Sequence, residues 1–135
     1  MKFPSTELVR RWQTLPMRDW PSQAFEDLGL KSPYAPNNLT IRREALEHTQ
    51  HLTRGDIVEC GVYRGQSLAS LAWWLREVSD PRIAWGFDSF AGFAPASGED
   101  ETDGFVPPFS QPHYYADTSL ETVKRFMDAL NLYDR

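Results

Sequence analysis

The sequence has little cysteine, no run of basic residues and no long hydrophobic stretch. Cys60 is its single cysteine, which excludes an internal disulfide and a CxxC zinc site and favours a reducing compartment. The net charge is −5 and no basic tract occurs, so we expect no binding to nucleic acid. The longest apolar run, residues 71–75, is far shorter than the ~20 residues of a membrane span. The first residues lack the apolar segment of a signal peptide, so we expect a cytoplasmic protein without membrane contact.

The remaining composition is that of one folded domain. Hydrophobic residues make up 41% of the 135 positions and aromatic residues 13%, which suffices for a core. Within residues 1–38, prolines separate short helical pieces. Their apolar faces comprise Leu8, Val9 and Trp12 in one piece and Phe25 and Leu28 in another. We interpret 1–38 as an N-terminal helical or irregular extension.

A longer helix is predicted after this extension. Thr40 is positioned to cap it. The helix is expected to run to about Leu52, with Ile41, Ala45, Leu46 and Leu52 facing inward.

Residues 56–87 have the pattern of a strand, a helix and a second strand. The apolar run 56–60 predicts a buried strand, and 82–87 predicts another. Between them, from Gln66, apolar residues recur at helical spacing, and Asp80-Pro81 ends the helix. Such continuous apolarity is typical of a parallel sheet covered on both faces. The predicted fold class is therefore α/β, a Rossmann-like βαβ three-layer sandwich.

The last third of the chain predicts a long loop and one more helix. The loop spans about residues 88–117. The segment Thr118–Glu121 offers a capping box, and the helix has an apolar stripe of Leu120, Val123, Phe126, Met127 and Leu130. Two strands form a sheet too small to bury its faces and edges well. We therefore expect 39–135 to be the N-terminal half of a larger, truncated domain. The alternative is a fold that ends here, with extra helices as cover.

The segment between the first strand and its helix is the candidate ligand site. Ligands of open α/β sheets bind at the carboxyl ends of the strands. Gly61 permits a turn and a close approach, and Gly65 permits a tight entry into the helix. The N–H groups at the start of that helix, around Gln66 and Ser67, favour an anionic group. A plain strand-to-helix turn is the alternative.

The residues of this turn restrict the class of ligand. The glycine spacing G-x-x-x-G lacks the third glycine of the dinucleotide fingerprint, and no Lys-Ser or Lys-Thr pair follows as in a P-loop. Glu59 suits a cationic amino group, while the helix start suits a carboxylate. Asp88, after the second strand, suits the two hydroxyls of a ribose. A nucleoside that carries an amino acid fits this set, and S-adenosylmethionine is the obvious candidate. The alternative, that Asp88 is only a solvated residue at the strand end or a helix cap, stays open.

Two segments resemble the macrocin O-methyltransferase family: the motif at residues 55–65, GDIVECGVYRG, and the motif at 85–95, WGFDSFAGFAP. With the segment 116–123 the resemblance covers roughly residues 40–135. It implies a class I S-adenosylmethionine-dependent enzyme that methylates a hydroxyl of a small molecule, often a sugar of a natural product. By resemblance, the methionine end is lined by Glu59, Gly61, Tyr63, Gly65 and Ser67, and the ribose is held by Asp88 and Ser89.

The sequence also departs from the family pattern. Gln66 stands where a second glycine is frequent, and Ala91 replaces an acidic residue. The resemblance implies a divalent cation held by aspartates on later strands, which this chain lacks. We therefore assign no catalytic base and no metal ligand, and we expect the chain alone to be inactive.

Other candidate sites and functions are weaker. Glu99–Gly104 resembles the start of a calcium loop but lacks its final glutamate. His48 and His51 share a helix face without a third ligand, His113 lies late in the loop, and Cys60 is expected to be a buried strand residue. The alternative function is a non-catalytic domain that binds a partner or itself, as a homo-oligomer, through the uncovered sheet edge. A fragment of a nicotinamide-dependent oxidoreductase is disfavoured by the missing glycine.

Overall fold

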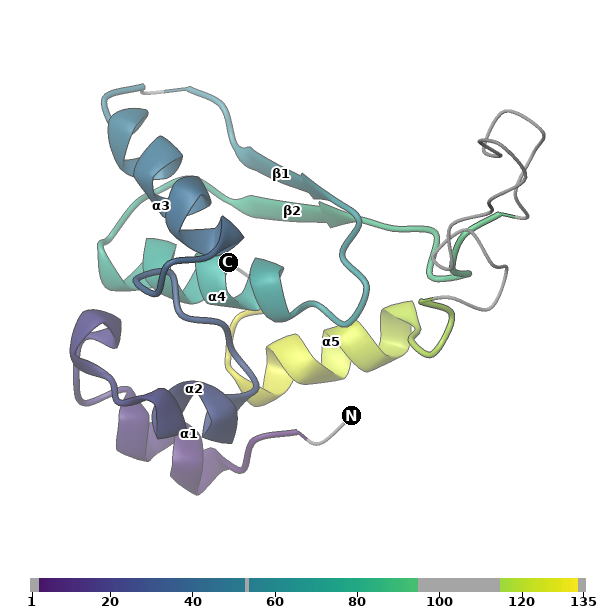
Figure 1. Cartoon of the computed structure of the whole chain (residues 1–135), viewed down its shortest axis with the longest axis horizontal. Helices are drawn as coiled ribbons and strands as arrows, with labels where there is room; N and C mark the ends of the chain where they lie inside the picture. The colour runs from purple at the N-terminus through teal and green to yellow at the C-terminus, as the bar shows by residue number, and fades with distance from the viewer. Residues whose placement is uncertain (1–2, 53, 95–114, 134–135) are drawn as a thin grey trace.

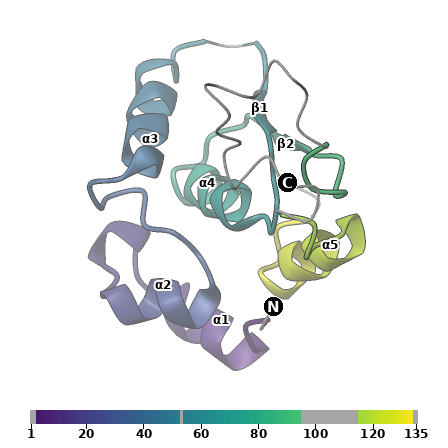
Figure 2. The same cartoon turned by 45° about the vertical axis from the view of Figure 1, so that its right-hand side comes forward.

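The computed structural model describes residues 3–52, 54–94 and 115–133. In chain order its elements are α1 (Thr6–Trp12), the 3-10 helix η1 (Met17–Asp19), α2 (Ser22–Leu28), α3 (Asn38–His48), β1 (Ile57–Cys60), α4 (Gln66–Glu77), β2 (Ala84–Phe87) and α5 (Leu120–Ala129). Figure 1 shows α4 between the two strands and the N-terminal helices, with α5 beside it. Figure 2 shows α3 and α5 on opposite sides of α4.

The N-terminal segment forms the short helices that its prolines predict. Ser5 caps α1 by accepting a hydrogen bond from the N–H of Leu8 at 3.3 Å. Gly29 ends α2 with a φ of 66°, a left-handed conformation that glycine adopts readily. The predicted apolar faces are turned inward: Val9, Trp12, Phe25 and Leu28 are buried, and Leu8 packs against them.

The prediction for α3 was wrong in its cap and in its buried face. Asn37, not Thr40, caps the helix and accepts hydrogen bonds from the N–H groups of Leu39 and Thr40. The helix ends at His48, and Leu39 is its buried residue, whereas Ile41 is 67% exposed. An earlier start and a mostly polar surface leave α3 to pack through Leu39 and the partly buried Leu46.

The two strands form a parallel sheet whose faces differ. Its register pairs Ile57 with Ala84, Val58 with Trp85, Glu59 with Gly86 and Cys60 with Phe87. Glu59 and Gly86 share the inner face; a Cβ on Gly86 would lie 2.5 Å from Leu68 of α4. On the outer face, Val58, Trp85 and Phe87 are 59%, 48% and 58% exposed, and Cys60 is exposed.

The expectation of buried strands covered on both faces was therefore wrong for the described residues, and so was the expectation of a buried Cys60. The reason is the position of the helices. Residues of α4 fill the inner face, and no described helix covers the outer one. The side chains that alternate outward along each strand consequently meet solvent.

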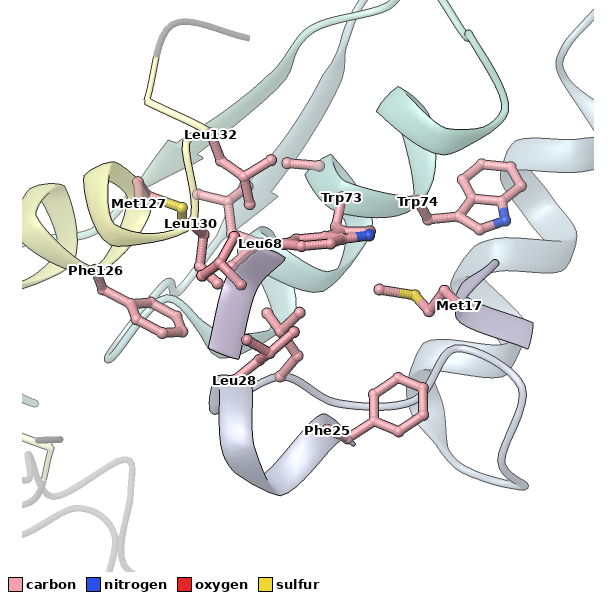
Figure 3. Close-up of a cluster of buried hydrophobic side chains, with 14 of the residues drawn as sticks. Met17, Phe25, Leu28, Leu68, Trp73, Trp74, Phe126, Met127, Leu130 and Leu132 are labelled. Carbon is pink, nitrogen blue, oxygen red and sulfur yellow. The ribbon is translucent and has the colours of Figure 1, made fainter. Parts of the chain in front are cut away.

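The core is centred on α4. Every residue from Leu68 to Leu75 is buried, as expected of a helix with neighbours on all sides. Trp73 and Trp74 point toward Met17 and Phe25 of the N-terminal segment, while Phe126, Met127 and Leu130 approach from the C-terminal part of the chain (Figure 3). One cluster thus joins the N-terminal segment, α4 and α5.

Helix α5 largely follows its predicted stripe. Val123, Phe126, Met127 and Leu130 are buried, but Leu120 is exposed, which corrects that prediction. Ser119 caps the helix by accepting from the N–H of Thr122 at 3.1 Å. Thr118 is therefore not the cap that the predicted box requires; its hydroxyl donates to the carbonyl of Tyr63.

The described residues thus form a mixed helix and strand structure with a parallel two-stranded sheet. This arrangement is compatible with an α/β methyltransferase-like fold, of which it contains one βαβ unit. The full three-layer sandwich and the domain boundary at residue 38 stay predictions. No described helix is long and apolar enough to cross a bilayer.

Candidate functional site

A cavity of about 510 Å³ opens at the carboxyl ends of β1 and β2. Pockets for small ligands typically measure roughly 300–1,000 Å³. Five of the seven residues that the sequence suggested line this cavity: Gly61, Tyr63, Ser67, Asp88 and Ser89. The other two, Glu59 and Gly65, lie outside the lining. All seven assignments to a cofactor stay predictions.

The two glycines of the turn have different reasons to be glycine. Both have a positive φ, 86° at Gly61 and 80° at Gly65. A Cβ on Gly61 would meet no atom within 4 Å, so the cavity is open at this point. A Cβ on Gly65 would lie 3.0 Å from Val123 of α5. Gly61 thus leaves space for a ligand, while Gly65 lets α5 pack closely.

Asp88 is held at the cavity by the backbone. Its Oδ2 accepts from the N–H of Tyr63 at 2.8 Å, and its Oδ1 accepts from the N–H of Phe90 at 2.7 Å. Burial favours the neutral acid, but these hydrogen bonds outweigh it and hold the pKa of Asp88 below its usual value. The carboxylate is therefore ionised at neutral pH.

Glu59 lies on the inner face of the sheet and is only 8% exposed. Its Oε1 accepts from Arg42 of α3, whereas Oε2 has no hydrogen-bond partner. Burial raises the pKa of Glu59, and the charges of Arg42 and Lys31 oppose this effect. A buried carboxylate oxygen without a donor is costly, which makes it a natural acceptor for a donor that arrives with a ligand.

Gln66, which the sequence placed at the start of the helix, also lines the cavity. Six further lining residues were not predicted from the sequence: Lys31, Val62, Arg64, Gly92, Phe93 and Tyr115. Val62 and Arg64 belong to the first motif, and Gly92 and Phe93 to the second, so membership of a motif was a signal that could have found them. Lys31 and Tyr115 come from outside both motifs. Only the folded chain brings them to the cavity.

One wall of the cavity is a small network around Asp117. The hydroxyl of Tyr63 donates to Asp117 Oδ1 at 2.6 Å, and Arg64 forms an ion pair with Oδ2. The hydrogen bond to Asp117 raises the pKa of Tyr63 and, in return, lowers that of Asp117. The ring of Tyr115 packs edge-on against Tyr63 at 4.7 Å. This network joins the turn after β1 to the start of α5.

Metal ligation finds no support among the residues that the structure describes. They contain no group of three or more histidine, cysteine, aspartate or glutamate side chains that could hold an ion. His48 and His51 stack edge to face at 6.5 Å between ring centroids. The acidic segment 99–104 and His113 lie outside the described residues.

The described residues thus form a mixed helix and strand protein with a candidate ligand site at the ends of two parallel strands. The family model of Macrocin-O-methyltransferase (TylF) matches residues 5–135. The chain belongs to this family, which is a family of methyltransferases. The match includes most of the N-terminal segment, beyond the region of about 40–135 that carried the resemblance. No curated protein matches the chain, and no solved structure does.

Proposed function

We propose that this protein is an S-adenosylmethionine-dependent O-methyltransferase that acts on a hydroxyl of a small molecule, such as a sugar or another natural product. The carrying observation is the cavity at the carboxyl ends of β1 and β2, where the glycine turn, Asp88 and the start of α4 converge. The methyltransferase family supports the type of reaction.

The residues present fit the cofactor. Asp88 is ionised and lines the cavity, so it is the acceptor we propose for the ribose hydroxyls, with Ser89 beside it. Gly61 leaves open space for close approach. Ser67, in the first turn of α4, faces the cavity where a carboxylate would be favoured. The unpartnered Oε2 of Glu59 is the acceptor we propose for the amino group, directly or through a water molecule.

When bound, S-adenosylmethionine would supply its methyl group to a deprotonated hydroxyl and would leave as S-adenosylhomocysteine. The described residues contribute by holding the cofactor in a fixed orientation, which is the main route to rate acceleration in such a transfer. We assign no residue of this chain as the base or as a cation ligand. That the chain alone binds without turnover remains a prediction, which methyl transfer by the purified protein would contradict.

The test is calorimetric titration of the full chain with S-adenosylhomocysteine and, in parallel, with NAD. We expect binding of S-adenosylhomocysteine alone. Gly61→Val should abolish it, because the new side chain enters the open space of the cavity. Gly55→Val is the matched control, since Gly55 also has a positive φ and an open Cβ position but does not line the cavity.

Two results would contradict the proposal. One is a chain that circular dichroism shows to be folded but that binds no S-adenosylhomocysteine. The other is equal loss of binding in the Gly61 and Gly55 variants, which would trace the loss to backbone strain rather than to the site. Binding of NAD instead would favour an oxidoreductase.

The outer face of the sheet favours a second candidate function, a domain that binds a protein partner or a second copy. Val58, Trp85 and Phe87 form an exposed apolar surface there, and such surfaces often mark interaction sites. Sedimentation velocity without ligand tests self-association. If this candidate is correct, the chain forms a dimer, and Trp85→Lys dissociates it. A chain that is monomeric at every concentration would rule out self-association through this face.

A further inference from the structure

Lys31 places a positive charge at the cavity from the N-terminal segment. It lies between α2 and α3, in the part of the chain that precedes both sequence motifs, and it lines the cavity beside Gln66 and Ser67. Its ammonium group forms no ion pair with the residues that the structure describes. The charge is therefore available to a ligand.

Two side chains of α4 fix the backbone at Lys31. The buried hydroxyl of Ser70 accepts from the N–H of Lys31 at 2.8 Å and donates to the carbonyl of Gln66 at 2.7 Å. The amide of Gln66 donates to the carbonyl of Gly29 at 3.1 Å. Gln66 stands where the family frequently has a glycine, and its side chain, together with Ser70, ties this segment to the helix.

The charges around the cavity are complementary to an α-amino acid. Lys31 is near enough to Glu59 for its charge to oppose the rise in the pKa of that carboxyl. Glu59 keeps one buried oxygen without a donor. The ammonium and carboxylate of an α-amino acid would be complementary to the Glu59 carboxylate, which lies outside the lining, and to the Lys31 ammonium within it; an uncharged group would gain from neither.

We propose that Lys31 binds the carboxylate of the ligand's amino-acid end, and that Ser70 and Gln66 are positioning residues for it. The inference rests on the proposed function, since it assigns one end of the same ligand. It adds a binding residue from the N-terminal segment to the residues of the two motifs.

The experiment compares two ligands on the full chain. S-adenosylhomocysteine carries the amino acid, and 5′-methylthioadenosine lacks it but keeps the thioether, ribose and adenine. Lys31→Met should weaken S-adenosylhomocysteine about ten-fold, as expected for a lost charged hydrogen bond, and leave 5′-methylthioadenosine unchanged. Lys31→Arg should retain most of the affinity. Lys124→Met is the control, because Lys124 lies on α5 and does not line the cavity.

Ser70→Ala tests the positioning of Lys31 without touching the cavity lining. We expect roughly a three-fold loss for S-adenosylhomocysteine and none for 5′-methylthioadenosine, with thermal unfolding recorded on the same samples. The inference fails if Lys31→Met weakens both ligands equally or neither. In that case intact binding by the unaltered chain leaves the proposed function standing. If the unaltered chain binds neither ligand, the proposed function itself fails, and the inference with it.

Discussion

The carboxyl ends of β1 and β2 each carry an acid, and the two acids have opposite surroundings. Asp88 follows β2, lines the cavity and is stabilised as an anion by backbone N–H groups. Glu59 lies in β1, is buried beside Arg42 and has a raised pKa and an unpartnered oxygen. Two acids near the same edge of a parallel sheet, one inside its strand and one just after it, can therefore have different chemistry. Asp88 is held by backbone N–H groups of Tyr63 and Phe90, whereas Glu59 keeps one carboxylate oxygen without a hydrogen-bond donor.

Replacing Asp88 should have the largest effect, because this side chain serves the turn and the ligand together. We expect Asp88→Ala to weaken both S-adenosylhomocysteine and 5′-methylthioadenosine by about 1–3 kcal/mol, since both ligands contain the ribose. Calorimetry measures this loss. Asp19→Ala, at an exposed position of η1, is the control. A loss of affinity confined to S-adenosylhomocysteine would assign Asp88 to the amino-acid end of the ligand, the role proposed for Glu59, and not to the ribose.

Gly86 pairs with Glu59 across the sheet and tests how tightly the inner face is packed. A Cβ at this position would lie 2.5 Å from Leu68 and 2.8 Å from Val62. Gly86→Ala should therefore lower the free energy of unfolding by about 1–3 kcal/mol, as measured by urea denaturation.

A double variant separates this overpacking from other effects of the substitution. Leu68→Ala removes the nearest side chain, so combining it with Gly86→Ala should cost less than the sum of the two single changes. Strict additivity would show that the contact with Leu68 is not the cause.

The smallest effect is expected from pH, through Glu59. Its raised pKa means that the folded chain without ligand holds this proton more tightly than a free glutamate does. An ammonium group beside Oε2 favours the deprotonated form. The affinity for S-adenosylhomocysteine should therefore be fully present above the pKa of Glu59 and fall several-fold as the pH drops from neutral through that value.

Glu59→Gln provides the control for this pH dependence. The variant should bind S-adenosylhomocysteine more weakly at neutral pH and lose the dependence that Glu59 causes. 5′-Methylthioadenosine, which has no ammonium, should show none of it in either protein. An unchanged pH profile in the variant would assign the dependence to another group.

The local elements were predictable because their signals are local. The strand, helix and strand of residues 56–87 follow from apolar runs and spacing, and β1, α4 and β2 appear there with slightly shorter strands. The cap of α3 was missed because Asn37 and Thr40 are both good caps, and the choice depends on where the preceding turn ends.

The features that the sequence analysis did not predict correctly depend on residues far apart along the chain. Which strand face is covered depends on where helices pack, and the exposure of Trp85 has no signature in its own strand. Lys31 is held at the cavity by the hydrogen bond from its N–H to Ser70, 39 positions later, and the nearby Gly29 accepts from Gln66, 37 positions later. The reason for Gly65 lies in α5, at Val123. No spacing rule connects such pairs.

The contact between Gly65 and α5 has a thermodynamic consequence. The turn that borders the cavity packs at Gly65 against Val123 and Met127 of α5. Hydrogen bonds of Asp117 and Thr118 connect the segment before α5 to Tyr63. The turn and α5 are therefore one cooperative unit. Free energy that a ligand contributes at the turn is shared by α5 through linkage. A ligand bound at the turn should therefore also reduce fraying of α5, a helix that lies far from the turn along the chain but contacts it in space.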